Sequence, residues 1–336
     1  MSAITQSFLS ETPQLRPLNI LRDLPRVADL VETCFSSTMD ADGQRFIQQL
    51  RRAGQDNRFL HWASNTVEST SMPLSGYVWE ENGALIGNVS LIPFHSRGRK
   101  IYLIANVAVH PDQRRRGIAR HLTETALEHT RKRKADATWL QVRDDNPGAI
   151  QLYSSLGFHE QARRTRWQAT PDRNLPDSGR EFDIRYRTSN QWPMQREWLQ
   201  RLYPENLAWY QPIPWIRFRP GLFPALYRFF MESETRTWTI SDPSGLAAAV
   251  SWLAGFNRNG YLWAALPERI ESHAVTALLL YVRRVLSGRE TLILDFPGGV
   301  AVDAIQDAGF NINRTLVWMR ADTTFGTELR KYSVSG

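Results

Sequence analysis

Residues 107–119 constrain this chain more than any other segment. They read Val-Ala-Val-His-Pro-Asp-Gln-Arg-Arg-Arg-Gly-Ile-Ala: a β-rich run ends before His110 and Pro111, and a helix begins at Gly117. The first turn of a helix carries backbone N–H groups without an internal partner and the positive end of the helix dipole. Because Gly117 and Ala119 have almost no side chain, an anion can approach the backbone here. The segment therefore predicts a cradle for a phosphate or pyrophosphate group.

The helix that starts at Gly117 is amphipathic. Its apolar positions recur at helical spacing and form one stripe: Ile118, Leu122, Ala126 and Leu127. Residues 131–134 then read Arg-Lys-Arg-Lys. Such a run can bind nucleic acid, but cations also favour the last turn of a helix, and we interpret it as a solvent-exposed helix end.

Two more segments follow the cradle. Residues 138–143 have the composition of a buried strand, and a short helix after Asn146 carries Tyr153 and ends at Gly157 and Phe158. Cradle, strand and helix together resemble the GNAT superfamily of acetyl-CoA-dependent N-acyltransferases.

Within that superfamily, residues 140–160 are most similar to the ribosomal-protein N-terminal alanine acetyltransferases. The resemblance covers residues 76–168 and extends toward residue 18. It implies an α/β fold of the α+β type, with a mixed, mostly antiparallel and splayed sheet flanked by helices.

The resemblance also implies a role for each segment. The pantetheine arm of CoA would lie like an extra strand beside the backbone of Val107, Ala108 and Val109. The pyrophosphate would face the backbone amides of Arg115, Arg116, Gly117, Ile118, Ala119 and Arg120. Asn146 would hydrogen-bond to the pantetheine, and Tyr153 would be the general acid that protonates the departing CoA thiolate. A phenol, with an ordinary pKa of about 10, is protonated at neutral pH and can donate.

One position departs from the nearest relatives. In the alanine acetyltransferases the strand before the Asn carries a Glu that acts as general base. The residue here is Gln141, whose side chain cannot take up a proton at neutral pH. Alternative candidates for the base are His95, His110, Glu80 and Glu81. Proton transfer to solvent and entry of the amine in its neutral form are further alternatives.

The second half of the chain repeats the first in outline. Residues 149–158 are echoed by residues 304–310, and an Arg-containing strand follows each copy. The turns Asn82–Gly83 and Ser244–Gly245 each lead into a similar strand, Val-Ser-Leu in one half and Val-Ser-Trp in the other. The rest of the second half keeps the same order, with a strand at 261–266, a helix at 274–285, a strand at 291–295 and a helix reaching residue 308.

A chain of 336 residues is long enough for about two domains. We therefore predict tandem GNAT-like domains. Residues 1–170 would be the acetyl-CoA-binding catalytic domain, and residues 180–325 a degenerate GNAT-like domain without the pyrophosphate loop. The polar, Pro-containing stretch at 171–179 would link them.

The two copies differ chemically. Where the first copy has its cradle, residues 267–272 contain two carboxylates and no glycine, which would repel a pyrophosphate. Counting back from the second Gly-Phe pair, Ile305 replaces Tyr153 and Gly298 replaces Asn146. We therefore expect the second copy to be a scaffold.

An aromatic, Pro-rich segment at residues 192–220 lies between the copies. It can form an acceptor pocket or docking surface, or it can be hydrophobic core. We favour inter-domain core, because large aromatic side chains supply much of the area that a fold buries.

Composition favours a cytoplasmic protein. Cys34 is the only cysteine, no apolar run approaches the ~18 residues of a membrane span, and the N-terminus lacks the pattern of a signal peptide. The net charge is +7, but the basic residues are scattered and CoA itself needs cationic neighbours. We therefore expect neither a membrane nor nucleic acid as a partner.

These features predict an N-acetyltransferase. It would move acetyl from acetyl-CoA to a primary amine by direct attack, without a metal ion, and the acceptor would be a small-molecule amine or a protein N-terminus. The alternative is a non-catalytic acyl-CoA-binding sensor or interaction module. Tyr153 separates the two hypotheses, because binding alone does not require a general acid.

Overall fold

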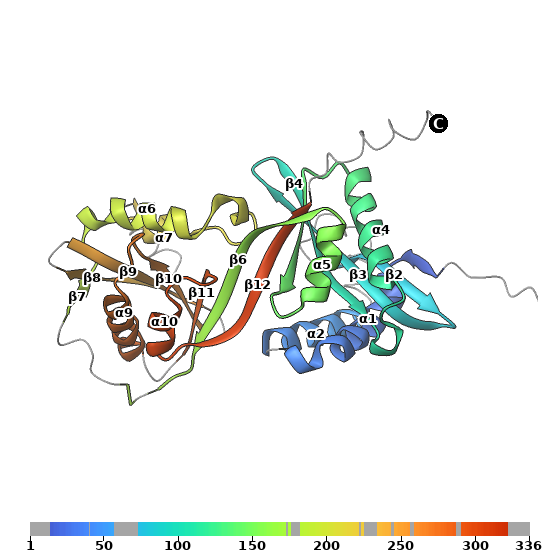
Figure 1. The fold of residues 1–336 in the computed structure, drawn as a ribbon, viewed down its shortest axis with the longest axis horizontal. Coiled ribbons are helices and arrows are strands. Elements are labelled where there is room, and N and C mark those ends of the chain that lie inside the picture. The colour runs from blue at the N-terminus through green and yellow to red at the C-terminus, as the bar shows by residue number, and fades with distance from the viewer. Residues whose placement is uncertain are drawn as a thin grey trace, which may run out of the picture. The chain divides into compact units, whose positions relative to one another are not determined.

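The computed structural model describes residues 14–39, 41–56, 73–172, 174–175, 182–221, 223–224, 234–242, 245–255, 259–286 and 290–321. The chain divides into two compact units. Unit 1 contains Met1–Gln161 and Trp318–Gly336, and unit 2 contains Ala162–Val317. Each unit has a sheet with helices on both faces (Figure 1). In the part of the chain that is described, no helix is long and apolar enough to span a bilayer.

The sheet of unit 1 has the order β1-β2-β3-β4-β5, followed by the end of β12. Its strands are β1 (Leu15–Pro17), β2 (Ser75–Glu81), β3 (Ala84–Ser96), β4 (Arg99–Val109), β5 (Ala137–Arg143) and β12 (Asn311–Ala321). β4 and β5 are parallel, whereas β1 to β4 pair antiparallel. Trp318 of β12 packs edge-on against Trp139 of β5, with ring centroids 6.4 Å apart.

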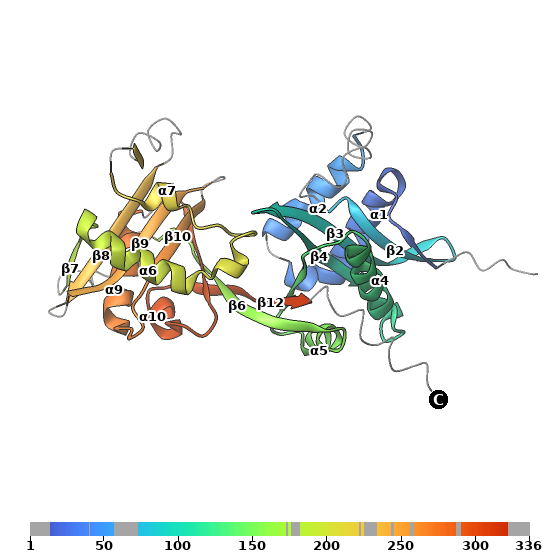
Figure 2. The ribbon, with the colours of Figure 1, turned by 90° about the horizontal axis from the view of Figure 1, so that it is seen from above.

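Helices cover both faces of this sheet. α4 (Ile118–Lys132) lies over one face, and α1 (Ile20–Phe35) and α2 (Ala41–Ala53) lie over the other, as Figures 1 and 2 show. The other helical elements in the described part of unit 1 are α5 (Pro147–Ser155) and the 3-10 turns Ser36–Thr38 and Pro111–Gln113. The predicted stripe of α4 is buried, which confirms that this helix is amphipathic: Ile118, Leu122, Ala126 and Leu127.

Unit 2 repeats this plan. Its sheet has the order β12-β6-β11-β10-β9-β8-β7, and β10 and β11 are parallel. The strands are β6 (Phe158–Ala169), β7 (Asp183–Tyr186), β8 (Thr235–Asp242), β9 (Gly245–Ala254), β10 (Asn259–Ala265) and β11 (Thr291–Pro297). The helices are α6 (Trp192–Leu202), α7 (Trp215–Phe218), α9 (Ser272–Val285) and α10 (Val302–Asp307), with 3-10 turns at Ser189–Gln191 and Glu205–Leu207.

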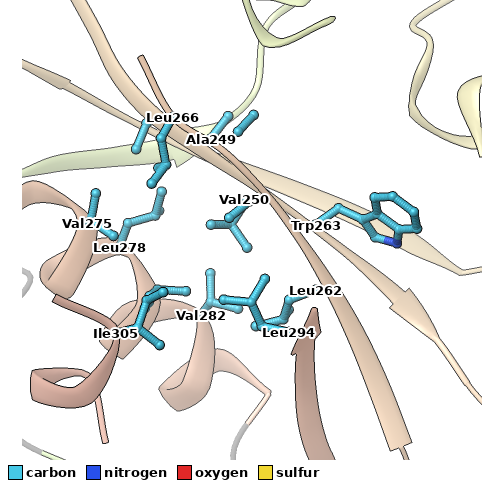
Figure 3. Close-up of a cluster of buried hydrophobic side chains, with 14 of the residues drawn as sticks. Ala249, Val250, Leu262, Trp263, Leu266, Val275, Leu278, Val282, Leu294 and Ile305 are labelled. Atoms are coloured by element: carbon cyan, nitrogen blue, oxygen red, sulfur yellow. The ribbon is translucent and has the colours of Figure 1, made fainter. Parts of the chain in front are cut away.

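The core of unit 2 lies between its sheet and its helices. Figure 3 shows Leu262 and Leu294 pointing toward Val282 of α9, whereas Trp263 points away from this cluster. The aromatic segment at 192–220 contributes Trp198, Tyr203 and Phe218 to the same buried core. These three residues are therefore core residues of unit 2 itself, whereas inter-domain core was expected.

The observed division differs from the predicted domain bounds of 1–170 and 180–325. The boundary falls inside β6, because residues 164–169 of that strand pair antiparallel with β11 of unit 2. The chain from Trp318 onward returns to unit 1. Residue 325 and residues 173 and 176–179 of the predicted linker lie outside the described residues.

Local turn chemistry is as predicted at the first hairpin. Asn82 and Gly83 join β2 to β3 with φ of 49° and 74°, the left-handed pair that suits a two-residue hairpin. The strand and helix order predicted for residues 261–308 is also present, as β10, α9, β11 and α10. In each unit, the strands therefore form the predicted mixed, mostly antiparallel and splayed arrangement flanked by helices.

Candidate functional site

The two parallel strands of unit 1 separate halfway along. β4 and β5 pair from Ile101 opposite Ala137 to Ile104 opposite Leu140, and the pairing stops there. Residues 105–109 and 141–143 continue as strands beyond the last pair. Their facing edges present backbone N–H and C=O groups that the sheet does not satisfy, so an extended ligand can add between them as a strand does. Gln141 is the first residue of β5 beyond the last pair.

A β-bulge lies at the same place on β4. Asn88 pairs with Ala108 and Ser90 pairs with Ala105, so Val89 alone faces two residues of β4. One of the two, Asn106, has a left-handed φ of 51°. A bulge bends its strand, and here it turns the predicted ligand-binding segment Val107, Ala108 and Val109 away from β5.

The turn after β4 has the backbone of an anion cradle. Arg115 and Gly117 have left-handed φ of 65° and 80°, and α4 starts directly after Gly117. Arg114 N–H donates to Pro111 O at 3.3 Å, and His121 N–H donates to Gly117 O at 3.1 Å. Between these two bonds, within the described residues, the amides of 115–120 donate to no backbone carbonyl. Consecutive free amides at a helix start bind anions.

The arginine side chains of the cradle differ in availability. Arg116 is held by Glu81 at 2.9 Å, and Arg120 donates to Ser155 Oγ at 2.7 Å. The second bond ties the first turn of α4 to the end of α5, the helix that carries Tyr153. The side chain of Arg115 is exposed to solvent and, in the described part of the chain, forms no such bond.

Tyr153 is a buried phenol on α5. It is 7% exposed, and its ring meets Phe158 edge-on with centroids 6.1 Å apart. Burial raises the pKa of Tyr153, because the charged phenolate loses its hydration. The hydroxyl therefore stays protonated well above neutral pH and can donate a proton.

Asn146 has a structural role as well as the predicted one. Its side-chain oxygen accepts a hydrogen bond from Ala149 N–H at 3.1 Å and caps α5. Its amide nitrogen is the half of the group that can donate to a ligand.

Two of the candidate bases are poor bases in this structure. The hydrogen bond from Arg16 lowers the pKa of Glu80, and the hydrogen bond from Arg116 lowers the pKa of Glu81. Both carboxylates are committed to ion pairs. His110 immediately follows β4, with Nδ1 3.7 Å from Asp112 Oδ2, and His95 lies opposite Lys100 near the other end of that strand. Of the four, His110 is therefore nearest to the separated end of β4.

The corresponding strands of unit 2 also separate, but there side chains of the same unit form hydrogen bonds with the separated strands. β10 and β11 stop pairing at Leu262 opposite Leu294. Two residues later on β10, Ala264 N–H donates to Tyr203 Oη at 3.2 Å. On β11, the backbone oxygen of Asp295 accepts from Arg164 Nη2 at 2.8 Å, and the Arg164 guanidinium lies 4.7 Å from the Tyr203 ring centre.

The residues that replace Asn146 and Tyr153 in unit 2 offer nothing comparable. Ile305 is 1% exposed in the hydrophobic core, and Gly298 N–H already donates to Arg163 O at 2.8 Å. Among the described residues, no group of three His, Cys, Asp or Glu side chains is placed to hold a metal ion.

Sequence reasoning missed two residues of these sites, Asn88 and Tyr203. A polar residue in the middle of the otherwise apolar strand at 85–92 was the available signal for Asn88. Tyr203 gave no such signal, because its neighbours are also aromatic and its partner Ala264 is 61 residues away.

Comparison with known proteins finds a family match that lies within unit 1. Residues 32–158 match the Acetyltransferase (GNAT) family. These residues form a GNAT-family domain. Over 67 residues the chain is 43% identical to the ribosomal protein bS18-alanine N-acetyltransferase of Escherichia coli, covering 20% of this chain and 45% of that protein. Over 61 residues it is 43% identical to a mycothiol acetyltransferase of Thermobispora bispora, covering 18% of this chain and 19% of that protein.

These matches cover less than half the length of either relative. The fold likeness extends further. The GCN5-related N-acetyltransferase from Sphaerobacter thermophilus aligns over 93% of this chain and 96% of that one, with a TM-score of 0.55 at 15% identity. The chain therefore shares its fold with that protein over nearly its whole length.

Proposed function

We propose that this protein is an N-acetyltransferase that moves acetyl from acetyl-CoA to a primary amine, with unit 1 as the catalytic unit. The observation that carries the proposal is the separation of β4 from β5 directly before the free amides of the α4 start. GNAT proteins use acetyl-CoA as donor, and this arrangement suits both halves of that molecule.

The donor would bind by its two polar parts. The pyrophosphate would sit against the amides of residues 115–120, with Arg115 free to approach it. The pantetheine would lie along Val107 to Val109 as an added strand, with the Asn146 amide donating to it. Backbone N–H groups of β4 would polarise the thioester carbonyl and stabilise the oxyanion that develops.

The reaction would be a direct attack. The amine nitrogen forms a bond to the thioester carbon, and the tetrahedral oxyanion then collapses and breaks the carbon–sulfur bond. The departing thiolate takes a proton from the Tyr153 hydroxyl. The amine loses its proton to solvent or through His110, and Tyr153 regains one from solvent. Holding amine and thioester together supplies a large part of the acceleration.

Two acceptor classes follow from the relatives. The Escherichia coli relative is named for an alanine of a ribosomal protein, which suggests a protein N-terminus. The mycothiol acetyltransferase suggests a small amine. A screen of both classes for release of free CoA would separate them.

Donor binding is tested by calorimetry with acetyl-CoA. We expect one equivalent to bind wild type, and none to bind Gly117→Trp. Gly98→Trp is the matched control, because Gly98 also has a left-handed φ, 75°, with open space around it, but lies in the β3–β4 hairpin. Two equivalents in wild type, or equal binding by both variants, would contradict the proposal.

Catalysis is tested by Tyr153→Phe. Loss of a general acid reduces kcat by about 10²-fold or more, and the Kd for CoA should stay within about twofold, because binding does not use the proton. Tyr77→Phe is the control. Tyr77 lies on β2, outside the proposed site, and its hydroxyl is hydrogen-bonded to His129 Nδ1. If kcat is unchanged in Tyr153→Phe, the alternative of an acyl-CoA-binding sensor gains support and Tyr153 is not the acid.

A further inference from the structure

Asn88 is a buried polar residue in the middle of β3. It is 0% exposed, and its neighbour Ser90 is 1% exposed. Asn88 Nδ2 donates to Asn106 O at 2.9 Å and to Ser90 Oγ at 3.3 Å. Asn88 Oδ1 is also buried and has no hydrogen-bond partner among the described residues. An unpaired buried acceptor is unfavourable, so stability alone does not explain an asparagine here.

The hydrogen bonds of Asn88 end on the bulge of β4. Asn106 is the left-handed residue of that bulge, and its own side chain reaches back to Ser90 Oγ at 3.4 Å. Asn88 therefore holds the carbonyl of the one residue whose conformation bends β4 away from β5.

Unit 2 provides an internal comparison. Ser251 opposes Trp263 directly after β10 leaves β11, just as Ser90 opposes Ala105 directly after β4 leaves β5. With the serines aligned, Ala249 takes the place of Asn88. β9 and β10 then pair without a register shift from Ala254 opposite Gly260 to Ala249 opposite Ala265. The copy with the asparagine has the bulge, and the copy with alanine does not.

We propose that Asn88 is a positioning residue for acyl transfer. By fixing the bulge at Asn106, it sets the direction of the amides of Val107 to Val109 that receive the acetyl carbonyl. This inference rests on the proposed function. Asn88 itself touches no reacting atom, because its side chain is fully buried and its hydrogen bonds go to Ser90 and Asn106.

Loss of Asn88 should affect the binding of acetyl-CoA and of CoA differently. Both ligands use the cradle at residues 115–120, which Asn88 does not contact. Only acetyl-CoA presents a thioester carbonyl to the bent part of β4. Loss of the hydrogen bonds from Asn88 to the bulge should therefore lower the affinity for acetyl-CoA more than the affinity for CoA.

The experiment compares the two ligands by calorimetry in wild type, Asn88→Leu and Asn88→Ala. Leucine fills about the same space and removes the unpaired acceptor, which offsets the loss of the bonds to Asn106 O and Ser90 Oγ, so Asn88→Leu should unfold in urea near the wild-type midpoint. We expect acetyl-CoA to bind it about tenfold more weakly, the equivalent of one net hydrogen bond, and CoA less than about threefold more weakly. Ser96→Ala, on the same strand but at the hairpin, should leave both affinities unchanged.

Amide hydrogen exchange of the peptide that covers residues 105–109 gives a second readout. Exchange should be faster in both Asn88 variants and unchanged in Ser96→Ala. Wild-type preference for acetyl-CoA in Asn88→Leu, or unchanged exchange in this peptide, would overturn the positioning role alone. Failure of wild type to bind either ligand would overturn the proposed function, and this inference with it.

Discussion

Tyr203 Oη accepts a hydrogen bond from the backbone N–H of Ala264, two residues beyond the point where β10 and β11 separate. In unit 1 the equivalent stretch of β4 is the one that we assign to acetyl-CoA. In unit 2 the Tyr203 side chain accepts a hydrogen bond from such a backbone amide. Its ring lies with its centroid 4.7 Å from that of Trp263 and also contacts the Arg164 guanidinium. This gives a structural reason, beyond the missing glycine, to expect a single donor site per chain.

The bond between Tyr203 and Ala264 should contribute to the stability of unit 2. Tyr203→Phe leaves the Ala264 N–H buried without an acceptor, and we expect a loss of about 1–3 kcal/mol in the free energy of unfolding. Urea denaturation measures it. Tyr186→Phe is the control, because Tyr186 is 62% exposed. Equal midpoints for the two variants would show that the bond carries no net stability.

Cys34 reports on the end of β4. Its thiol donates to Val109 O at 3.2 Å, and burial raises the pKa of the thiol, so little reactive thiolate forms at neutral pH. As the only cysteine in the chain, it gives a single labelling signal. We expect slow alkylation by iodoacetamide that slows several-fold further with saturating acetyl-CoA, measured by mass spectrometry.

The control for this labelling experiment is Gly117→Trp, in which acetyl-CoA should give no protection. Equal protection in that variant would place the ligand somewhere other than the cradle at residues 115–120.

The raised pKa of Tyr153 predicts the alkaline side of the pH profile. If Tyr153 is the proposed general acid, its protonated form is the active one, and burial keeps that form populated above the ordinary pKa of about 10. kcat should therefore not fall between about pH 8 and pH 10, while kcat/KM rises as the acceptor amine loses its proton. Steady-state rates with an acceptor from the screen measure both. A fall in kcat centred below pH 10 would mean that a group other than Tyr153 is the acid.

The sequence predicted where the helices and strands lie better than it predicted which strands pair with each other. Periodicity and turn residues located the strand at 137–143 and the helix at 118–132 to within a few residues. They could not show that β6 pairs with β11, because a strand pattern identifies a strand and not its partner. The domain bounds were displaced for that reason.

The candidate site shows the same limit. Gly117 could be singled out from local sequence and Tyr153 from the GNAT resemblance, and the roles of both stay predictions. Asn88 could not, because its role depends on Asn106, 18 residues away across a hairpin, and on a bulge that no residue type specifies. The ion pairs that make Glu80 and Glu81 poor bases likewise depend on Arg16 and Arg116 from other elements.

The N-terminus of α1 contains a buried carboxylate whose effect on stability should depend on pH. Asp23 is 0% exposed and binds Arg16 at 2.6 Å and Asn19 N–H at 2.9 Å. Burial by itself would raise the pKa of Asp23, but the bonds from Arg16, Asn19 and Arg22 together outweigh it and leave the pKa below its ordinary value. The folded state therefore gains stability from the charged form above the unfolded pKa of about 3.9 and loses it as the pH falls below that.

Asp23→Asn should accordingly cost about 2–4 kcal/mol at pH 7, because it leaves Arg16 without its buried partner. The difference from wild type should shrink as the pH falls below about 4. Urea denaturation at pH 7 and at pH 3 measures both effects. Asp29→Asn, on the same helix but 66% exposed at its side chain, should change stability by less than about 1 kcal/mol at either pH. A difference between Asp23→Asn and wild type that stays constant with pH would mean that the side chain acts through its shape and helix capping, and not through its charge.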